Sequence, residues 1–192
     1  MLNLRRSVVG AALVLLVSGV ASAQTPSPTD IAALRVKANA GNADAQYNLG
    51  VWYRFGQGVP QDSAQGAAWI RKSSEQGHIG AQFYLGLIYF NGQGVPQDYA
   101  QAASWYLKSS EQGNPGAQFN LGLMYSNGQG VPQDYVEAHK WRNLAASRAS
   151  AENQTRYAET RDAVATLMTP AQLAEAQTLA REWQAAFDAR QE

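Results

Sequence analysis

The chain reads AQFYLGLIYFNGQGVPQD from Ala81 to Asp98. The same pattern begins 36 residues earlier at Ala45, as AQYNLGVWYRFGQGVPQD, and 36 residues later at Ala117, as AQFNLGLMYSNGQGVPQD. A repeat of this length is typical of stacked helix pairs, each of which buries its apolar face against its neighbours. Such stacks form long binding surfaces, and near-identical units rarely bring the different groups of a catalytic site to one point. The repeat therefore predicts an all-α protein that binds partners.

Each copy carries the signals for two helices and the turn between them. In the second copy, Ala81, Leu85 and Tyr89 fall on one face of a first helix. Gly92 is expected to end that helix in a left-handed conformation. Asp98 is expected to cap the second helix, with Gln101 as its capping-box partner. The equivalent pairs are Asp62 with Gln65 and Asp134 with Glu137.

Two further positions recur at fixed spacing. A glycine stands in the middle of every first helix, where it costs roughly 1 kcal/mol against alanine. We expect close helix–helix contact at these positions, which are Gly50, Gly86 and Gly122. Every second helix carries a tryptophan that we expect to pack between repeats; these are Trp69, Trp105 and Trp141.

The pattern A-Q-x-x-L-G-x-x-Y-x-x-G-x-G-V-x-x-D-x-x-x-A-x-x-W over residues 45–148 closely resembles the Sel-one-like repeat family, a branch of the tetratricopeptide-like solenoids. The resemblance implies an α/α solenoid of antiparallel helix hairpins, a tetratricopeptide-like superhelix, with a helical C-terminal cap. Gly66 departs from the family, which prefers alanine there, and is expected to loosen the first hairpin slightly.

The resemblance also implies that the first helices line a concave face. Inward positions that differ between copies, largely aromatic and uncharged apart from one arginine, would form a groove for an apolar or amphipathic peptide. Val51, Leu87 and Leu123 accompany them. Phe83 and Phe119 could equally belong to the hairpin core. The candidate partner-binding residues are Tyr47, Arg54, Phe55, Phe83, Phe90, Asn91, Phe119, Ser126 and Asn127.

The two ends of the chain differ from the repeats. Residues 1–23 combine Arg5 and Arg6, a short apolar run and a small-residue cleavage site before Gln24, which predicts a signal peptide. A flexible leader is expected at 24–29, a capping helix at 30–44, repeats at 45–80, 81–116 and 117–152, and a helical cap at 153–192. In that cap, Thr169 and Gln172 form a capping-box pattern. An apolar stripe from Leu173 to Phe187 is expected to seal the stack.

The sequence shows no pattern typical of catalysis. His78 takes the helix-cap slot of Asn42 and Asn114, and we expect His139 to be a surface or capping residue. The three repeated aspartates would cap separate helices rather than converge. We therefore predict no catalytic, cofactor or metal residues. The chain has no cysteine, and without its first 23 residues it carries 13 basic and 15 acidic side chains. This balance argues against nucleic acid as a partner.

These observations favour an exported, monomeric, non-catalytic adaptor at the bacterial cell envelope, located in the periplasm and binding a protein or peptide partner. Secretion is also possible, and no membrane insertion is expected once the signal is cleaved. Two alternatives stay open. One is a protein that binds or hydrolyses peptidoglycan fragments or β-lactams. The other is a periplasmic regulatory subunit of a membrane sensor.

Overall fold

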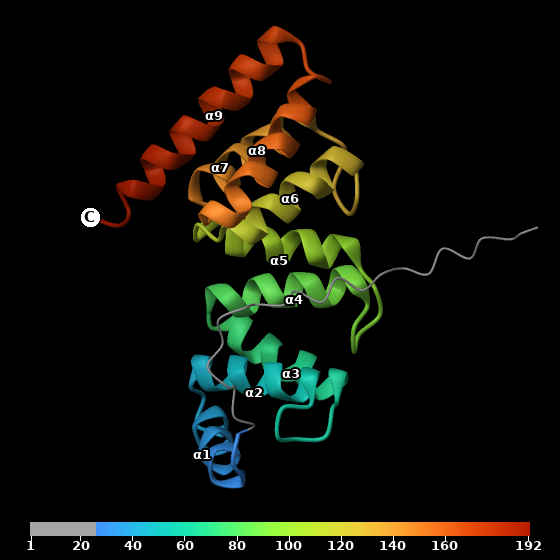
Figure 1. Ribbon diagram of the computed structural model, residues 1–192, viewed down its shortest axis with the longest axis vertical. Coiled ribbons are helices and arrows are strands. Elements are labelled where there is room, and N and C mark those ends of the chain that lie inside the picture. The colour runs from blue at the N-terminus through green and yellow to red at the C-terminus, as the bar shows by residue number, and fades with distance from the viewer. Residues whose placement is uncertain (1–25) are drawn as a thin grey trace, which may run out of the picture.

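The computed structural model describes residues 26–192, and over that range it is an all-α solenoid. The helices stack along the long axis of the molecule from α1 to α8, and α9 folds back against α7 (Figure 1). The predicted fold class is confirmed. The helices are α1 Pro28–Asn39, α2 Ala43–Phe55, α3 Ser63–Glu75, α4 Ile79–Asn91, α5 Tyr99–Glu111, α6 Pro115–Asn127, α7 Tyr135–Arg148, α8 Ala151–Ala165 and α9 Pro170–Asp188.

A signal peptide and a flexible leader were expected before the first helix. The predicted signal peptide lies outside the described residues. α1 begins at Pro28, inside the segment expected to be a flexible leader, because Ser27 and Asp30 form a complete capping box around its first turn. No helix within residues 26–192 has the length and apolarity needed to cross a membrane.

Side-chain caps define where the repeated helices begin. Asp98 accepts a hydrogen bond from the backbone N–H of Gln101, and Asp62 and Asp134 do the same on α3 and α7. The expected capping boxes are incomplete on these three helices. The side chain of the third helical residue does not accept a hydrogen bond from the backbone N–H of the capping aspartate. Glu137, for example, accepts from Trp141 Nε1 at 2.9 Å. The aspartates therefore cap these helices alone, whereas the box predicted at Thr169 and Gln172 is complete.

The turn between the two helices of a repeat contains two glycines with different roles. Gly92 adopts φ 66° and closes α4 in the left-handed conformation, as predicted. Gly94, with φ +80°, lies against the backbone of Ser63 at the start of α3 in the preceding repeat. A Cβ at this position would collide with that backbone. The second glycine of the turn therefore sets how closely consecutive repeats stack.

The glycines in the first helices lie at tight helix–helix contacts, as predicted. A Cβ added to Gly86 would come 2.5 Å from the ring of Tyr106 on α5. Gly66 does not loosen the first hairpin. A Cβ there would lie 2.9 Å from the Gly50 carbonyl oxygen, so the glycine lets α2 and α3 approach more closely than alanine would allow.

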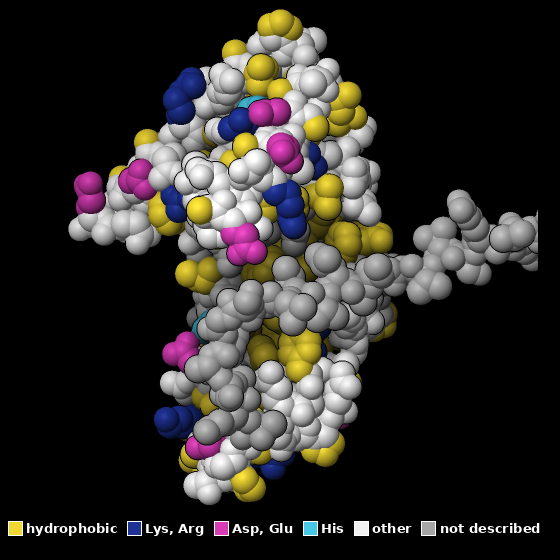
Figure 2. Space-filling model, in the orientation of Figure 1, with side chains coloured by type: hydrophobic (Ala, Val, Ile, Leu, Met, Phe, Trp, Pro, Cys, Tyr) yellow, Lys and Arg dark blue, Asp and Glu magenta, His cyan; other side chains and the backbone are white. Residues whose placement is uncertain are grey.

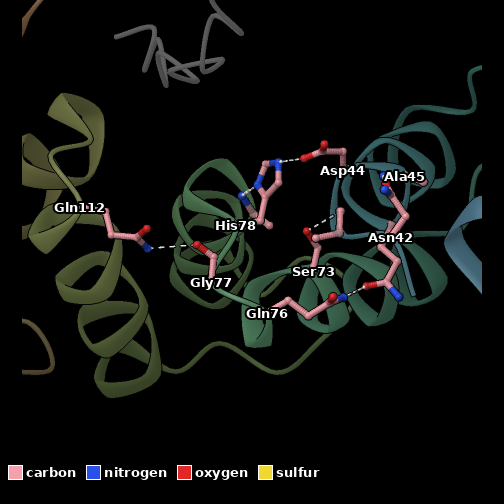
Figure 3. Close-up of polar contacts among 11 residues, drawn as sticks. Asn42, Asp44, Ala45, Ser73, Gln76, Gly77, His78 and Gln112 are labelled. Carbon is pink, nitrogen blue, oxygen red and sulfur yellow. Dashed lines mark hydrogen bonds and ion pairs between the residues drawn. The ribbon is translucent and has the colours of Figure 1, made fainter. Parts of the chain in front are cut away.

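A ladder of hydrogen bonds between an exposed and a buried glutamine joins consecutive repeats. Gln76 Nε2 donates to Gln46 Oε1 at 2.6 Å, and the equivalent Gln112 donates to Gln82 at 2.7 Å. Figure 3 shows Gln76 and Gln112 at these junctions, where Gln112 also reaches the Gly77 carbonyl. The next residue in the series is Arg148. It bonds Gln184 on α9 instead, and the Oε1 atom of Gln118 is left buried without a partner in the described part of the chain.

The last two helices close the stack. α8 starts at Ala151, where the first helix of a fourth repeat would begin, and it packs on α7. α9 crosses α7 instead of pairing with α8, and its Trp183 covers Trp141 edge to face at 5.9 Å between ring centroids. Trp141 is consequently buried, whereas Trp69 and Trp105 are half-buried with Lys72 and Lys108 over their rings.

Candidate binding groove

The candidate groove runs along the first helices of the repeats, α2, α4 and α6. α4 and α6 contain no charged residue, and they contact one another directly. In Figure 2, hydrophobic side chains are visible near the middle of the face shown, between α4 and the helices of the first repeat. Many apolar side chains on this face stay partly exposed between the helices. They are therefore not fully used in the hydrophobic core.

The first section of the groove is an aromatic cluster between α2 and α4. Tyr47 stacks on His78 at 4.8 Å and meets Tyr84 edge to face at 5.7 Å. The guanidinium of Arg54 lies over the Tyr84 ring at 5.7 Å and over the Phe55 ring at 5.5 Å. Phe55 keeps 53% of its surface exposed. This section offers rings and one cation to a partner.

Arg54 is the basic group of this cluster. It bonds the side chain of Gln93 in the next turn, and burial lowers the pKa of its guanidinium. Among the described residues it forms no ion pair with a carboxylate. A half-buried, unpaired guanidinium beside aromatic rings is a strong site for a partner carboxylate.

The second section is a small apolar pocket of about 150 Å³ between α4 and α6. Phe90 and Asn91 line it, together with Leu87 and Leu123. Its lining also includes Tyr106, whose ring passes beneath Gly86 from α5. Burial raises the pKa of the Tyr106 hydroxyl. The pocket is of a size to hold one apolar side chain.

Sequence reasoning missed Tyr84 and Tyr106. The position opposite each recurrent glycine changes from Ile70 to Tyr106 to Arg142 while the glycine does not, but only the structure shows that these residues face the glycines. Tyr84 stands where the other copies have Asn48 and Asn120.

The remaining candidates are placed differently. Phe119 stacks on Tyr157 of α8 at 4.3 Å and lies under the Arg156 guanidinium, while Phe83 is half-buried against Tyr106. Both rings therefore serve packing between helices. Ser126 and Asn127 line a separate hollow beside α8, and the Ser126 hydroxyl donates to the Gly122 carbonyl. The structure thus groups Tyr47, Arg54 and Phe55, and separately Phe90 and Asn91, as accessible groove residues.

The two histidines have different environments. His78 caps α4 as predicted: its Nδ1 accepts from the Ala81 N–H at 3.0 Å, and its Nε2 lies 3.3 Å from the Asp44 carboxylate (Figure 3). His139 was expected at the surface, and this was wrong. Its exposure is 3%, because α8 and α9 close over α7 at that point. Burial and the charge of Arg161 lower its pKa.

No group of three or more potential metal ligands occurs among residues 26–192. Asp62, Asp98 and Asp134 each cap a different helix, as expected.

Comparison with known proteins adds family and fold information. Residues 43–78, 79–114 and 115–150 each match the Sel1 repeat, so more than half of the chain is covered. Among curated proteins, no sequence matches the chain.

Several solved structures are similar, and two of them illustrate the match. One is a protective antigen present in uropathogenic Escherichia coli strains and displaying an SLR fold, with 34% identity and a TM-score of 0.73 over 84% of this chain. The other is a Sel1 repeat protein from Oxalobacter formigenes, with 32% identity and a TM-score of 0.61 over 64% of this chain. The chain spans 35% of the first protein and 50% of the second.

Proposed function

Because this chain belongs to the Sel1 repeat family, whose members generally mediate protein–protein interactions, we propose that it is a non-catalytic adaptor of the bacterial cell envelope. In this proposal the processed protein works in the periplasm, and its groove along α2, α4 and α6 holds a segment of a partner protein. The similarity to an antigen that displays the same fold is consistent with a place at the cell envelope.

The observation that supports the proposal is that an aromatic cluster and an apolar pocket lie between consecutive first helices. The aromatic cluster around Tyr47 and Tyr84 lies between α2 and α4, and the apolar pocket at Phe90 lies between α4 and α6. In this proposal, neighbouring repeats supply consecutive subsites. A peptide that follows the solenoid axis would meet them in order.

The chemistry of the groove defines the partner segment. It would carry an apolar or aromatic side chain for the pocket at Phe90 and a carboxylate for Arg54. Buried aromatic rings and arginine are the residue types that contribute most to protein interfaces. Since α4 and α6 carry no charge, a segment with charged residues at its centre would be left without partners for them.

The test is affinity capture from envelope extract, followed by titration of the recovered partner. The wild-type protein should retain a partner that the Arg54→Ala/Phe90→Ala variant loses. Arg71→Ala is the matched control, because Arg71 is an exposed arginine on α3, outside the groove, that bonds the Tyr89 hydroxyl. Equal retention by both variants would rule out the groove and direct attention to α9, where Trp183 and Phe187 stack at 5.0 Å.

A further inference from the structure

A second site, separate from the groove, lies where α7, α8 and α9 meet. A cavity of about 430 Å³ opens between these helices. Its walls include His139 and Asn143 from α7, Arg161 and Asp162 from α8, and Leu173 and Arg181 from α9. In Figure 2, basic, acidic and histidine side chains gather on the part of the surface formed by these helices. This volume falls in the range of small-molecule sites, about 300–1,000 Å³.

The charges in the cavity leave one cation unpaired. Arg161 is held by the Asp162 carboxylate at 2.7 Å and by the Asn143 side-chain oxygen at 3.3 Å. Arg181 bonds only the Thr178 hydroxyl on its own helix, and among the described residues it has no carboxylate partner. Two guanidinium groups against one carboxylate give the walls a net charge that suits a monoanion.

His139 supplies the second observation. The equivalent residues in the other repeats are Ala67 and Ala103, so the repeat framework has no need of an imidazole here. The side chain lines the cavity at 3% exposure, and its Nδ1 has no hydrogen-bond partner among the described residues. A buried polar group without a partner costs free energy, so the imidazole is kept here at a cost that the repeat framework does not explain.

We propose that this cavity binds a small organic monoanion, a carboxylate with a short apolar group. The carboxylate would be held between the guanidinium groups of Arg161 and Arg181, which match carboxylate geometry. The apolar group would lie against Leu173. The site is formed by the C-terminal helices and not by the groove. The proposal is therefore independent of the adaptor function.

The presence of only two histidines makes the test direct. Butyrate, acetate, phosphate and chloride are titrated at equal ionic strength, and the imidazole resonances are followed by NMR. The His78→Asn variant assigns the signals, because asparagine stands at the same cap position in the other repeats. Butyrate should shift the His139 signals saturably and more tightly than acetate, leaving His78 unchanged. An equal response to chloride, a preference for phosphate over butyrate, or no saturable shift would overturn the proposal.

Two arginine variants near the C-terminus provide the matched pair. Arg181→Gln should weaken butyrate binding at least tenfold, while replacement of Arg190, an exposed arginine just after the end of α9, by glutamine should leave it unchanged. Arg181 is itself exposed, so its replacement should leave the melting temperature near that of the wild type. Undiminished butyrate binding in Arg181→Gln would contradict the assignment of the carboxylate to the two guanidinium groups.

Discussion

At the scale of single residues, the molecule depends on small side chains placed opposite large ones. Gly86 is the clearest case, because the ring of Tyr106 fills the space that a Cβ would need. Tyr106 reaches the groove pocket through that contact. A packing feature of the repeat thereby becomes part of the candidate site.

Replacing this glycine should be costly. Gly86→Leu should lower the free energy of unfolding by about 1–3 kcal/mol, because the added atoms overpack the contact with Tyr106. Urea denaturation measures the change. Ser104→Leu is the control, since Ser104 is exposed on α5 and can take the same side chain without a clash. A variant at Gly86 as stable as this control would mean that the two helices are not in close contact.

The groove residues should affect binding but not folding. The double change Arg54→Ala with Phe90→Ala should weaken the captured partner at least tenfold, about 1.4 kcal/mol, through loss of the cation and of one pocket wall. Calorimetric titration gives the affinity. The melting temperature should stay near that of the wild type, because both side chains are only partly buried. Leu85→Ala, which empties a fully buried site, should instead cost about 2–5 kcal/mol of stability.

His139 should make stability depend on pH. Its pKa is lowered in the folded state by burial first and then by Arg161, with Asp162 opposing. The unfolded chain therefore binds more protons between the folded pKa and about 6.5. The free energy of unfolding should fall as pH decreases below about 6.5. His139→Ala, the residue of the other repeats, should show a smaller fall in urea denaturation at the same pH values. An identical pH dependence would show that this histidine does not contribute.

At the scale of elements, α9 ends the stack by crossing α7. Its Trp183 covers Trp141, and its Gln184 takes the hydrogen bond of Arg148. The glutamine ladder stops there, which leaves Gln118 without the partner that Gln46 and Gln82 have. The last repeat thus lacks one hydrogen bond of the ladder, and Arg148 instead contacts the terminal helix.

Removing the central side chain of this contact should expose Trp141. Trp183→Ala should destabilise the protein by about 2 kcal/mol, less than the 3–5 kcal/mol of a fully buried tryptophan because Trp183 is half-buried. Tryptophan fluorescence should also shift to longer wavelength as Trp141 becomes solvated. Leu167→Ala is a suitable control, since Leu167 is 59% exposed. If the emission and stability stay unchanged, α9 does not seal the stack.

At the scale of the whole molecule, three near-identical hairpins and their terminal helices stack around a series of hydrophobic clusters, and they carry two candidate sites. The groove lies on the repeats, and the polar cavity lies among the terminal helices. Repeats provide the same framework at each step, so specificity depends on the positions that change between copies and on the helices that break the pattern.

The export prediction also belongs to this scale. The protein isolated from its cells should begin at Gln24, because residues 1–23 carry the features of a cleaved signal peptide. Intact-mass spectrometry of the envelope fraction decides the matter. A protein that retains Met1 in the membrane fraction would contradict the periplasmic assignment.

The sequence by itself determined the helices, their caps and the mid-helix contacts. Asp98 and Gly92 act through bonds within a few residues, and Gly86 recurs at a spacing that only a stack explains. Only the tertiary structure decided that His139 is buried, that α9 packs on α7, and that Tyr106 lines the groove pocket. These depend on contacts between residues far apart in the chain. They lie where the repeat ends or varies, so no neighbouring copy indicated how the side chains would pack.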